Sequence, residues 1–266
     1  MASTEGGRRL TELHREAQFR IGLDTVRQLD NLWVLLNAEG RIPTVEAWLE
    51  AVMLVLGRQH RISAEIARTY YTQFALQEHA EQQLLAWEQI RFQERAARVS
   101  MIAVGPAKLR EGIRRGLDVA EAARRAREAV AREGMRIALD GGRRQIIDAV
   151  QRDRRALGWI RVTDGDPCAF CAMLASRGPV YKGRETAIAG TVFSTRVNDF
   201  QAHASCGCQA EPVFTSDTEW PGRGREFRDL WNRAQSKATA DPEWASKGTK
   251  NDALNNFLRL LEESRR

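Results

Sequence analysis

The chain has 266 residues, of which 43% are apolar and 29% charged, so it can bury a substantial core beneath long polar helix faces. Its formal net charge of +6 favours an anionic partner, although net charge bears on association and not on fold. No apolar run reaches the ~18 residues of a membrane span, which excludes a transmembrane helix. The first residues carry no apolar signal-peptide core, so we expect synthesis in the cytosol, where thiols stay reduced.

The first half of the chain has the apolar spacing of long helices. One helix is expected over residues 8–37, and a second begins at Pro43 and ends or bends at Gly57. A third is expected over residues 63–102, where Gly105-Pro106 breaks it. The sequence therefore predicts a mainly helical N-terminal region.

Three more helical pieces are expected before residue 156, over residues 107–116, 118–138 and 142–155. The piece over 118–138 is rich in Ala and Arg and poor in larger apolar residues. We expect that piece to be exposed or to pack against a partner.

The positive charge is concentrated between Arg91 and Ile160, where 17 Lys and Arg stand against 9 Asp and Glu. One interpretation is the solvated face of long helices. The other is contact with nucleic acid, which would be nonspecific because no aromatic residues alternate with the basic ones. The candidate phosphate contacts are Arg114, Arg115, Arg124, Arg125, Arg143 and Arg144.

The pattern changes near Leu157. A short strand is expected from there to Thr163, a short helix over 168–176 and a strand over 208–214. Two terminal helices are expected, over 224–237 and 250–264. This order predicts three parts: a helical arm or bundle over residues 1–156, a small α+β module over 157–215, and helices over 216–266 that pack on the module.

All four cysteines lie between positions 168 and 208, as Cys168-x-x-Cys171 and Cys206-x-Cys208, and His203 precedes the second pair. A Cys-x-x-Cys turn lets two thiolates reach one ion, and alternate residues of a strand point to the same side. The spacing favours a structural zinc site whose ligands come from Cys168, Cys171, His203, Cys206 and Cys208. Such a site would clasp the module and offset the entropy of the loop between the pairs.

Several alternatives remain open for this cluster. Four thiolates suffice for zinc with His203 outside the ligand set, or His203 replaces one cysteine. The thiols could instead be packed and free, or could form disulfides after release from the cell. A catalytic arrangement would pair Cys206 or Ser205 with His203, but the neighbouring sequence offers no evident oriented base or oxyanion hole.

The stretch from Trp159 to Phe214 resembles the C-terminal module of the phage Mu F-like family of minor head proteins. The matching features are the strand at Trp159, the Asp166-Pro-Cys168-x-x-Cys171 turn, and the His203-x-x-Cys206-x-Cys208 run that leads into a second strand. Ala204 and Ser205 stand where the family often has proline or asparagine. The helical N-terminal part is similar to homologues from phages of actinobacteria only in its general residue pattern.

The resemblance implies a virion protein of tailed phages, present in few copies, that associates with the portal inside the head after assembly in the host cytoplasm. It implies the portal, scaffold or major capsid protein as partners, together with nonspecific contact to packaged DNA. Some relatives are described as capsid maturation proteases, which gives an enzymatic alternative. Residues 215–266 look too short for an added enzyme, so we expect the structural version.

Overall fold

The structure is a computed structural model that describes residues 2–36, 42–79, 85, 87–163, 167–178, 206–215, 222–240 and 252–265. Its helices are α1 (Glu5–Leu32), α2 (Ile42–His79), α3 (Glu94–Ile102), α4 (Lys108–Arg114), α5 (Val119–Arg152), α6 (Ala169–Ala175), α7 (Gly224–Ala240) and α8 (Asp252–Glu263). Its strands are β1 (Gly158–Val162) and β2 (Gln209–Val213). The expected fold class, mainly helical with a small C-terminal α+β part beside a cysteine cluster, is confirmed.

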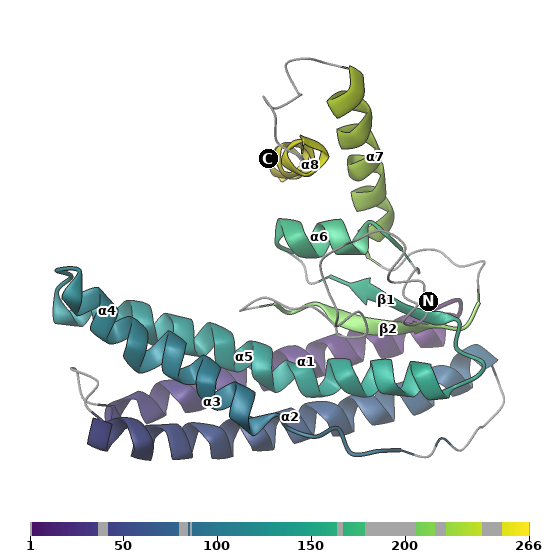
Figure 1. The fold of residues 1–266 in the computed structure, drawn as a ribbon. Coiled ribbons are helices and arrows are strands. Elements are labelled where there is room, and N and C mark those ends of the chain that lie inside the picture. The colour runs from purple at the N-terminus through teal and green to yellow at the C-terminus, as the bar shows by residue number, and fades with distance from the viewer. Residues whose placement is uncertain are drawn as a thin grey trace.

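Helices α1, α2 and α5 lie side by side as a long bundle, with α3 and α4 along one end (Figure 1). The two-stranded sheet lies on the bundle, α6 lies on the sheet, and α7 and α8 stand beyond α6. We refer to α6, α7 and α8 as the C-terminal cap. No helix among the described residues combines the length and apolar character that a bilayer crossing requires.

Two apolar cores stabilise the bundle. One fills the end near α3 and α4 with fully buried side chains such as Trp48, Leu56 and Met101. The other joins Tyr71 and Phe74 of α2 to residues of α5, the sheet and three of the cysteines. The second core therefore couples the bundle directly to the C-terminal part.

The expected end of a helix at Gly57 is wrong, because α2 runs without interruption from Ile42 to His79. A single glycine costs a helix only about 1 kcal/mol relative to alanine, which tertiary packing easily offsets. At Gly57 the ring of Phe92 lies 3.4 Å from the position that a Cβ would occupy. The glycine therefore marks a crossing of chain segments.

The expected helix over 63–102 is wrong in its middle but right at its end, because α3 ends at Ile102, just before Gly105-Pro106. Residues 87–93, inside the long helix that we expected, are not helical, whereas Gly105 and Pro106 lie in a π-helical segment, Ala103–Ala107, that joins α3 to α4. The wider π turn accommodates the missing N–H of proline. Gly105 is needed there because a Cβ would lie 2.9 Å from the Trp48 ring.

Helix α5 merges the two helices expected over 118–138 and 142–155. A Cβ on Gly141 would lie 2.0 Å from the carbonyl oxygen of His60, so the glycines at 141 and 142 bring α5 against its neighbours. The expectation that 118–138 is exposed or covered by a partner is corrected as well. Its small residues, such as Ala126 and Ala138, are fully buried within the bundle, where they allow close helix packing.

The C-terminal elements agree with the sequence pattern. Strands β1 and β2 pair antiparallel, with Arg161 opposite Ala210, and every residue of both strands is buried. The cap has a core of its own, in which Ala172 and Ala175 of α6 contact an apolar set from α7 and α8 that includes Phe227 and Phe257. Helix α6 is thus the element that joins the cap to the rest of the molecule.

Candidate metal centre

The first cysteine pair lies at the start of α6. Pro167 precedes the helix, and Cys168 is its N-cap residue in an extended conformation. The Sγ atom of Cys168 accepts a hydrogen bond from the backbone N–H of Cys171 at 3.4 Å. One helical turn later, Cys171 points into the core and is completely buried.

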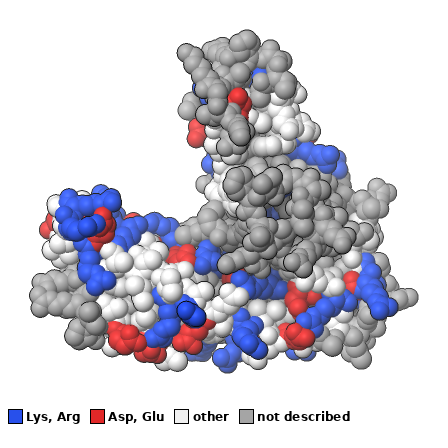
Figure 2. Space-filling view, viewed as in Figure 1, with Lys and Arg blue, Asp and Glu red and all other residues white. Residues whose placement is uncertain are grey.

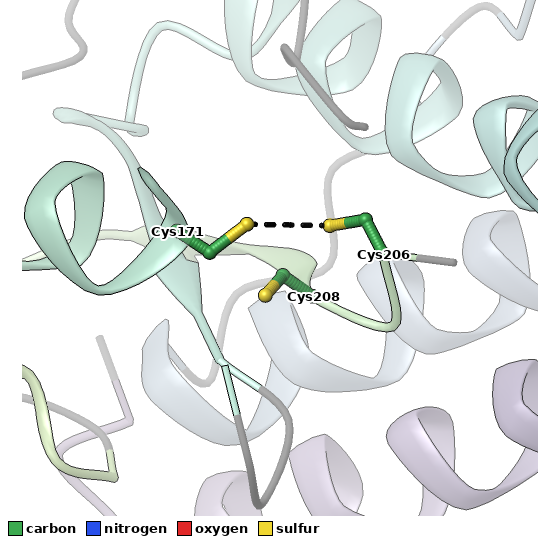
Figure 3. Close-up of side chains that lie close together, drawn as sticks. All are labelled: Cys171, Cys206 and Cys208. Atoms are coloured by element: carbon green, nitrogen blue, oxygen red, sulfur yellow. Dashed lines mark hydrogen bonds between the residues drawn. The ribbon is translucent and has the colours of Figure 1, made fainter. Parts of the chain in front are cut away.

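The second pair lies in the extended segment that enters β2. Cys206 and Cys208 are each 1% exposed and, as expected from strand alternation, both approach Cys171. The Sγ atoms of Cys171, Cys206 and Cys208 all lie within 4.8 Å of one another, and that of Cys171 is 3.5 Å from that of Cys206. Figure 3 shows the three side chains converging from α6 and from the segment before β2.

This donor set fits a tetrahedral soft metal ion. Two thiolates bound to one zinc at ~2.3 Å are roughly 3.8 Å apart in a tetrahedron, and the three sulfur atoms already have separations of that size. Thiolates select zinc and similar soft ions over magnesium or calcium. A tetrahedral site needs one more ligand besides Cys171, Cys206 and Cys208.

Cys168 and His203 are the remaining sequence candidates for that ligand. Cys168 is half-buried at the start of α6 but is not within 4.8 Å of all three other sulfur atoms. His203 and Ser205 lie outside the described residues. The catalytic pairing of His203 with Cys206 or Ser205 therefore stays a prediction.

Two buried arginines accompany the cysteines. The guanidinium of Arg143 on α5 is 0% exposed; its Nε donates to the carbonyl oxygen of Cys208 at 3.0 Å and its Nη2 to that of Cys206. Arg161 of β1 is 2% exposed, and its Nη1 donates to Cys171 Sγ at 3.6 Å. The cluster is therefore held in place from α5, β1 and α6 at once.

Hydrogen bonding and charge perturb the thiols strongly. Hydrogen bonds from Cys171 and Cys208, together with the positive charges of Arg143 and Arg161, lower the pKa of Cys206. The same hydrogen bond with Cys206 raises the pKa of Cys171. The environment thus favours a thiolate at Cys206, the form in which cysteine binds metal.

The predicted phosphate contacts have different surroundings from those we expected. Arg143 is fully buried and donates hydrogen bonds to backbone carbonyl oxygens, so it cannot reach a phosphate. The prediction that it contacts phosphate from the surface was wrong. Arg144 pairs with Asp140 at 2.6 Å. The other four are exposed but paired with nearby glutamates: Arg114 and Arg115 with Glu111, and Arg124 and Arg125 with Glu121. Figure 2 shows basic side chains gathered at the α4 end of the bundle with acidic ones among them.

Sequence reasoning missed the roles of three buried charged residues near the motif. Arg161 interrupts an otherwise apolar strand, which is a readable signal of a charge held in the interior. Glu211 of β2 is 1% exposed and accepts hydrogen bonds from the Ala2 backbone N–H at 3.0 Å and from the Thr11 hydroxyl at 2.7 Å. Arg143 follows Gly141 and Gly142, which bring α5 close to its neighbours. Only the packing of the helices shows that its side chain points into the interior.

A known protein family includes both the cysteine motif and the helices around it. The model of the VG15 protein family matches residues 7–234, a range that covers the bundle, the sheet, the cysteine cluster and most of α7. The chain belongs to the VG15 family. The Gene 15 protein of Mycobacterium phage D29 is 32% identical over 179 aligned residues, in a match that covers 57% of this chain and 65% of that protein. The match thus spans less than two thirds of the D29 protein.

These comparisons make the chain a member of a phage-encoded VG15 family. No solved structure matches it. The arrangement of the cysteine cluster therefore rests on the geometry described here.

Proposed function

We propose that this VG15 protein is a minor head protein of a tailed phage, associated with the portal inside the head. Family membership and the similarity to a phage protein support a role in a phage particle. The observation that carries the proposal is the convergence of Cys171, Cys206 and Cys208, because these residues also carry the resemblance to Mu F-like minor head proteins. Those residues contribute a structural clasp to the protein.

In this proposal, Cys171, Cys206 and Cys208 hold a structural zinc ion with a fourth ligand from Cys168 or His203. The bound ion would supply a cross-link between chain segments that are distant in sequence. Cys171 ties α6 to the segment before β2, which Arg143 in turn attaches to the bundle. Because Ala172 and Ala175 of α6 pack on α7 and α8, the clasp also positions the cap.

The bundle is the proposed partner-binding part. A groove between α1 and α2 is lined by the apolar side chains of Leu13, Ala17, Ile62 and Ile66, together with charged ones such as Glu16 and Arg58. Leu13 at its edge is 53% exposed. An apolar groove of this kind suits a helix of another head component. The proposed partner is the portal protein, with scaffold and major capsid protein as further contacts.

Co-expression with the portal protein of the same phage tests the proposal. The intact chain should co-purify with the portal, and Leu13→Glu together with Ile66→Glu should reduce recovery by about tenfold or more, because a charge in the groove opposes apolar docking. The matched control is Val99→Glu, at an apolar position of α3 that is 65% exposed. A portal that the wild-type chain fails to capture would overturn the assignment.

Proteolysis of the major capsid protein is the outcome that would replace this proposal with the enzymatic alternative. Co-expression of the chain with the capsid protein should leave the latter at full length. Cleavage that disappears in His203→Ala would identify the chain as a maturation protease. Binding to DNA that weakens steeply with salt, with a slope near roughly −0.9 per phosphate contacted, would support the nonspecific DNA contact.

A further inference from the structure

Two of the three converging thiols lie in direct contact. The Sγ atoms of Cys171 and Cys206 are 3.5 Å apart, and Figure 3 shows the two side chains pointing toward one another, with Cys208 beside them. Because a disulfide bond is about 2.05 Å long, each sulfur atom would have to move by roughly 0.7 Å to form one. That movement is within the roughly 0.9 Å that thermal motion gives a well-ordered atom. The pair is therefore placed to form a bond without a change of fold.

The two cysteines in contact come from different parts of the fold. Cys171 belongs to α6, and Cys206 lies 35 positions further along the chain, in the segment before β2. A bond between them would hold α6 against that segment, as the proposed metal ion does. A bond within either cysteine pair would close only a short loop, and the stabilisation from a cross-link falls as the loop shortens. The contacting pair is thus the one whose bond would replace the clasp.

The redox conditions around this pair change during the life of the proposed head protein. The host cytosol keeps thiols reduced during assembly, which favours bound metal. A particle released from the cell meets oxidising conditions, in which disulfides form and persist. Both sulfur atoms are also ligands of the proposed metal clasp, so a bound ion and a disulfide exclude each other at this pair.

We infer that Cys171 and Cys206 form a disulfide when the cluster holds no metal and meets a peroxide oxidant. Hydrogen peroxide oxidises one thiol to a sulfenic acid and releases water, and the second thiol then displaces the sulfenic hydroxyl as another water. The two thiols lose two protons and two electrons in total, the O–O bond breaks and one S–S bond forms. The inference rests on the proposed function for the setting in which oxidant arrives, whereas the pairing depends only on the geometry of the cluster.

Peptide mapping tests the pairing in the full-length chain, freed of metal with a chelator and treated with equimolar hydrogen peroxide. Both thiols are buried, so peroxide reaches them when the site opens locally, and the reaction is followed over hours. Trypsin places the first cysteine pair on peptide 162–177 and the second on peptide 197–223. We expect the two peptides joined by a disulfide as the main oxidised product, in excess over the product from the same chain in denaturant. Separate peptides, with internal disulfides or sulfinic acids, would overturn the inference.

Single serine variants identify the two partners of the bond. Cys171→Ser and Cys206→Ser should lose the joined product. Cys168→Ser and Cys208→Ser are the matched controls on the same two peptides and should keep it, and serine is itself a good N-cap residue at position 168. Circular dichroism shows whether each variant remains helical. Loss of the joined product in Cys168→Ser, with retention in Cys171→Ser, would contradict the inference.

Zinc separates this inference from the metal clasp. Zinc at about ten times its dissociation constant should slow formation of the disulfide about tenfold, because only the metal-free fraction reacts. A wild-type chain that forms the bond but binds no zinc would overturn the metal clasp and support the inference. A chain that binds zinc but, once stripped of it, gives no joined product would overturn the inference alone. Portal capture tests the head-protein role separately.

Discussion

The bundle and the C-terminal cap differ in how much apolar interior holds them. Helices α1, α2 and α5 have 28, 38 and 34 residues and enclose fully buried side chains such as Trp48 and Phe74. The cap consists of a seven-residue helix, α6, packed on α7 and α8 around a smaller core. The free energy gained by burying a small core barely exceeds the entropic cost of ordering the chain. An additional cross-link therefore matters most for the cap.

The cysteine cluster lies where these two regions meet. Cys171 belongs to α6, but its side chain enters the core that the bundle shares with the sheet. We therefore expect damage to the cluster to release the cap while the bundle persists. The predictions below test that contrast, beginning with the largest effect.

If the proposed metal clasp exists, replacing Cys171 by serine should abolish metal binding and release the cap. The loss is several kcal/mol, because metal-binding free energy in such sites is folding free energy. Hydrogen exchange should rise across α6, α7 and α8 and stay slow in α1, α2 and α5. The control is Ser236→Ala at an exposed position of α7. Equal loss of protection in the bundle and the cap would show that the two regions unfold as one unit.

Phe257→Ala should destabilise the cap by about 3–5 kcal/mol, because this ring is completely buried among α6, α7 and α8. Limited proteolysis should then cut within the cap while the bundle remains intact. Glu262→Ala, on the exposed side of α8, is the matched control. A uniform fall in the melting temperature of the whole chain, with no early cleavage of the cap, would contradict an independent cap.

Gly141→Ala should destabilise the bundle by about 1–3 kcal/mol or more, despite the better helix propensity of alanine. The added Cβ would lie 2.0 Å from the carbonyl oxygen of His60, and backbone cannot easily give way. Gly57→Ala is the matched control in α2, where the nearest atom is the Phe92 ring at 3.4 Å. We expect the control to be neutral or stabilising by up to about 1 kcal/mol. Thermal unfolding of both variants provides the comparison.

Acid should weaken the bundle through His14, whose ring stacks on Tyr70 with centroids 4.3 Å apart. Burial lowers the pKa of His14 from 6.5 to about 3, so the folded state holds the neutral ring. Its contribution is complete above pH 6.5 and is lost as the pH falls towards 3, by up to about 1.4 kcal/mol per pH unit. Between pH 7 and 5, wild type should therefore lose about 2 kcal/mol more free energy of unfolding than His14→Phe. Equal losses in urea titrations would contradict this.

The elements of the C-terminal part were predictable because strong local signals mark them. The apolar run at Trp159 predicted β1, Pro167 with Cys168 marked the start of α6, and the spacing of Leu260 and its neighbours predicted α8. The boundaries near residues 156 and 215 stay predictions. In the bundle, some local signals misled, because α2 runs through Gly57 and α5 runs through Gly141. At Gly141 the backbone of His60 comes too close for a Cβ, whereas at Gly57 the ring of Phe92 lies at an ordinary contact distance of 3.4 Å.

For this protein, the amino-acid order alone determined the helical class, the two short strands and the set of sulfur donors, because periodicity and residue spacing are local properties. Only the tertiary structure decided which three thiols meet and that Arg143 lies beneath them rather than on the surface. Helices of about eight to eleven turns bring together residues that are far apart in sequence. The direction of a buried side chain then depends on the packing of several helices at once. No pattern within a single segment contains that information.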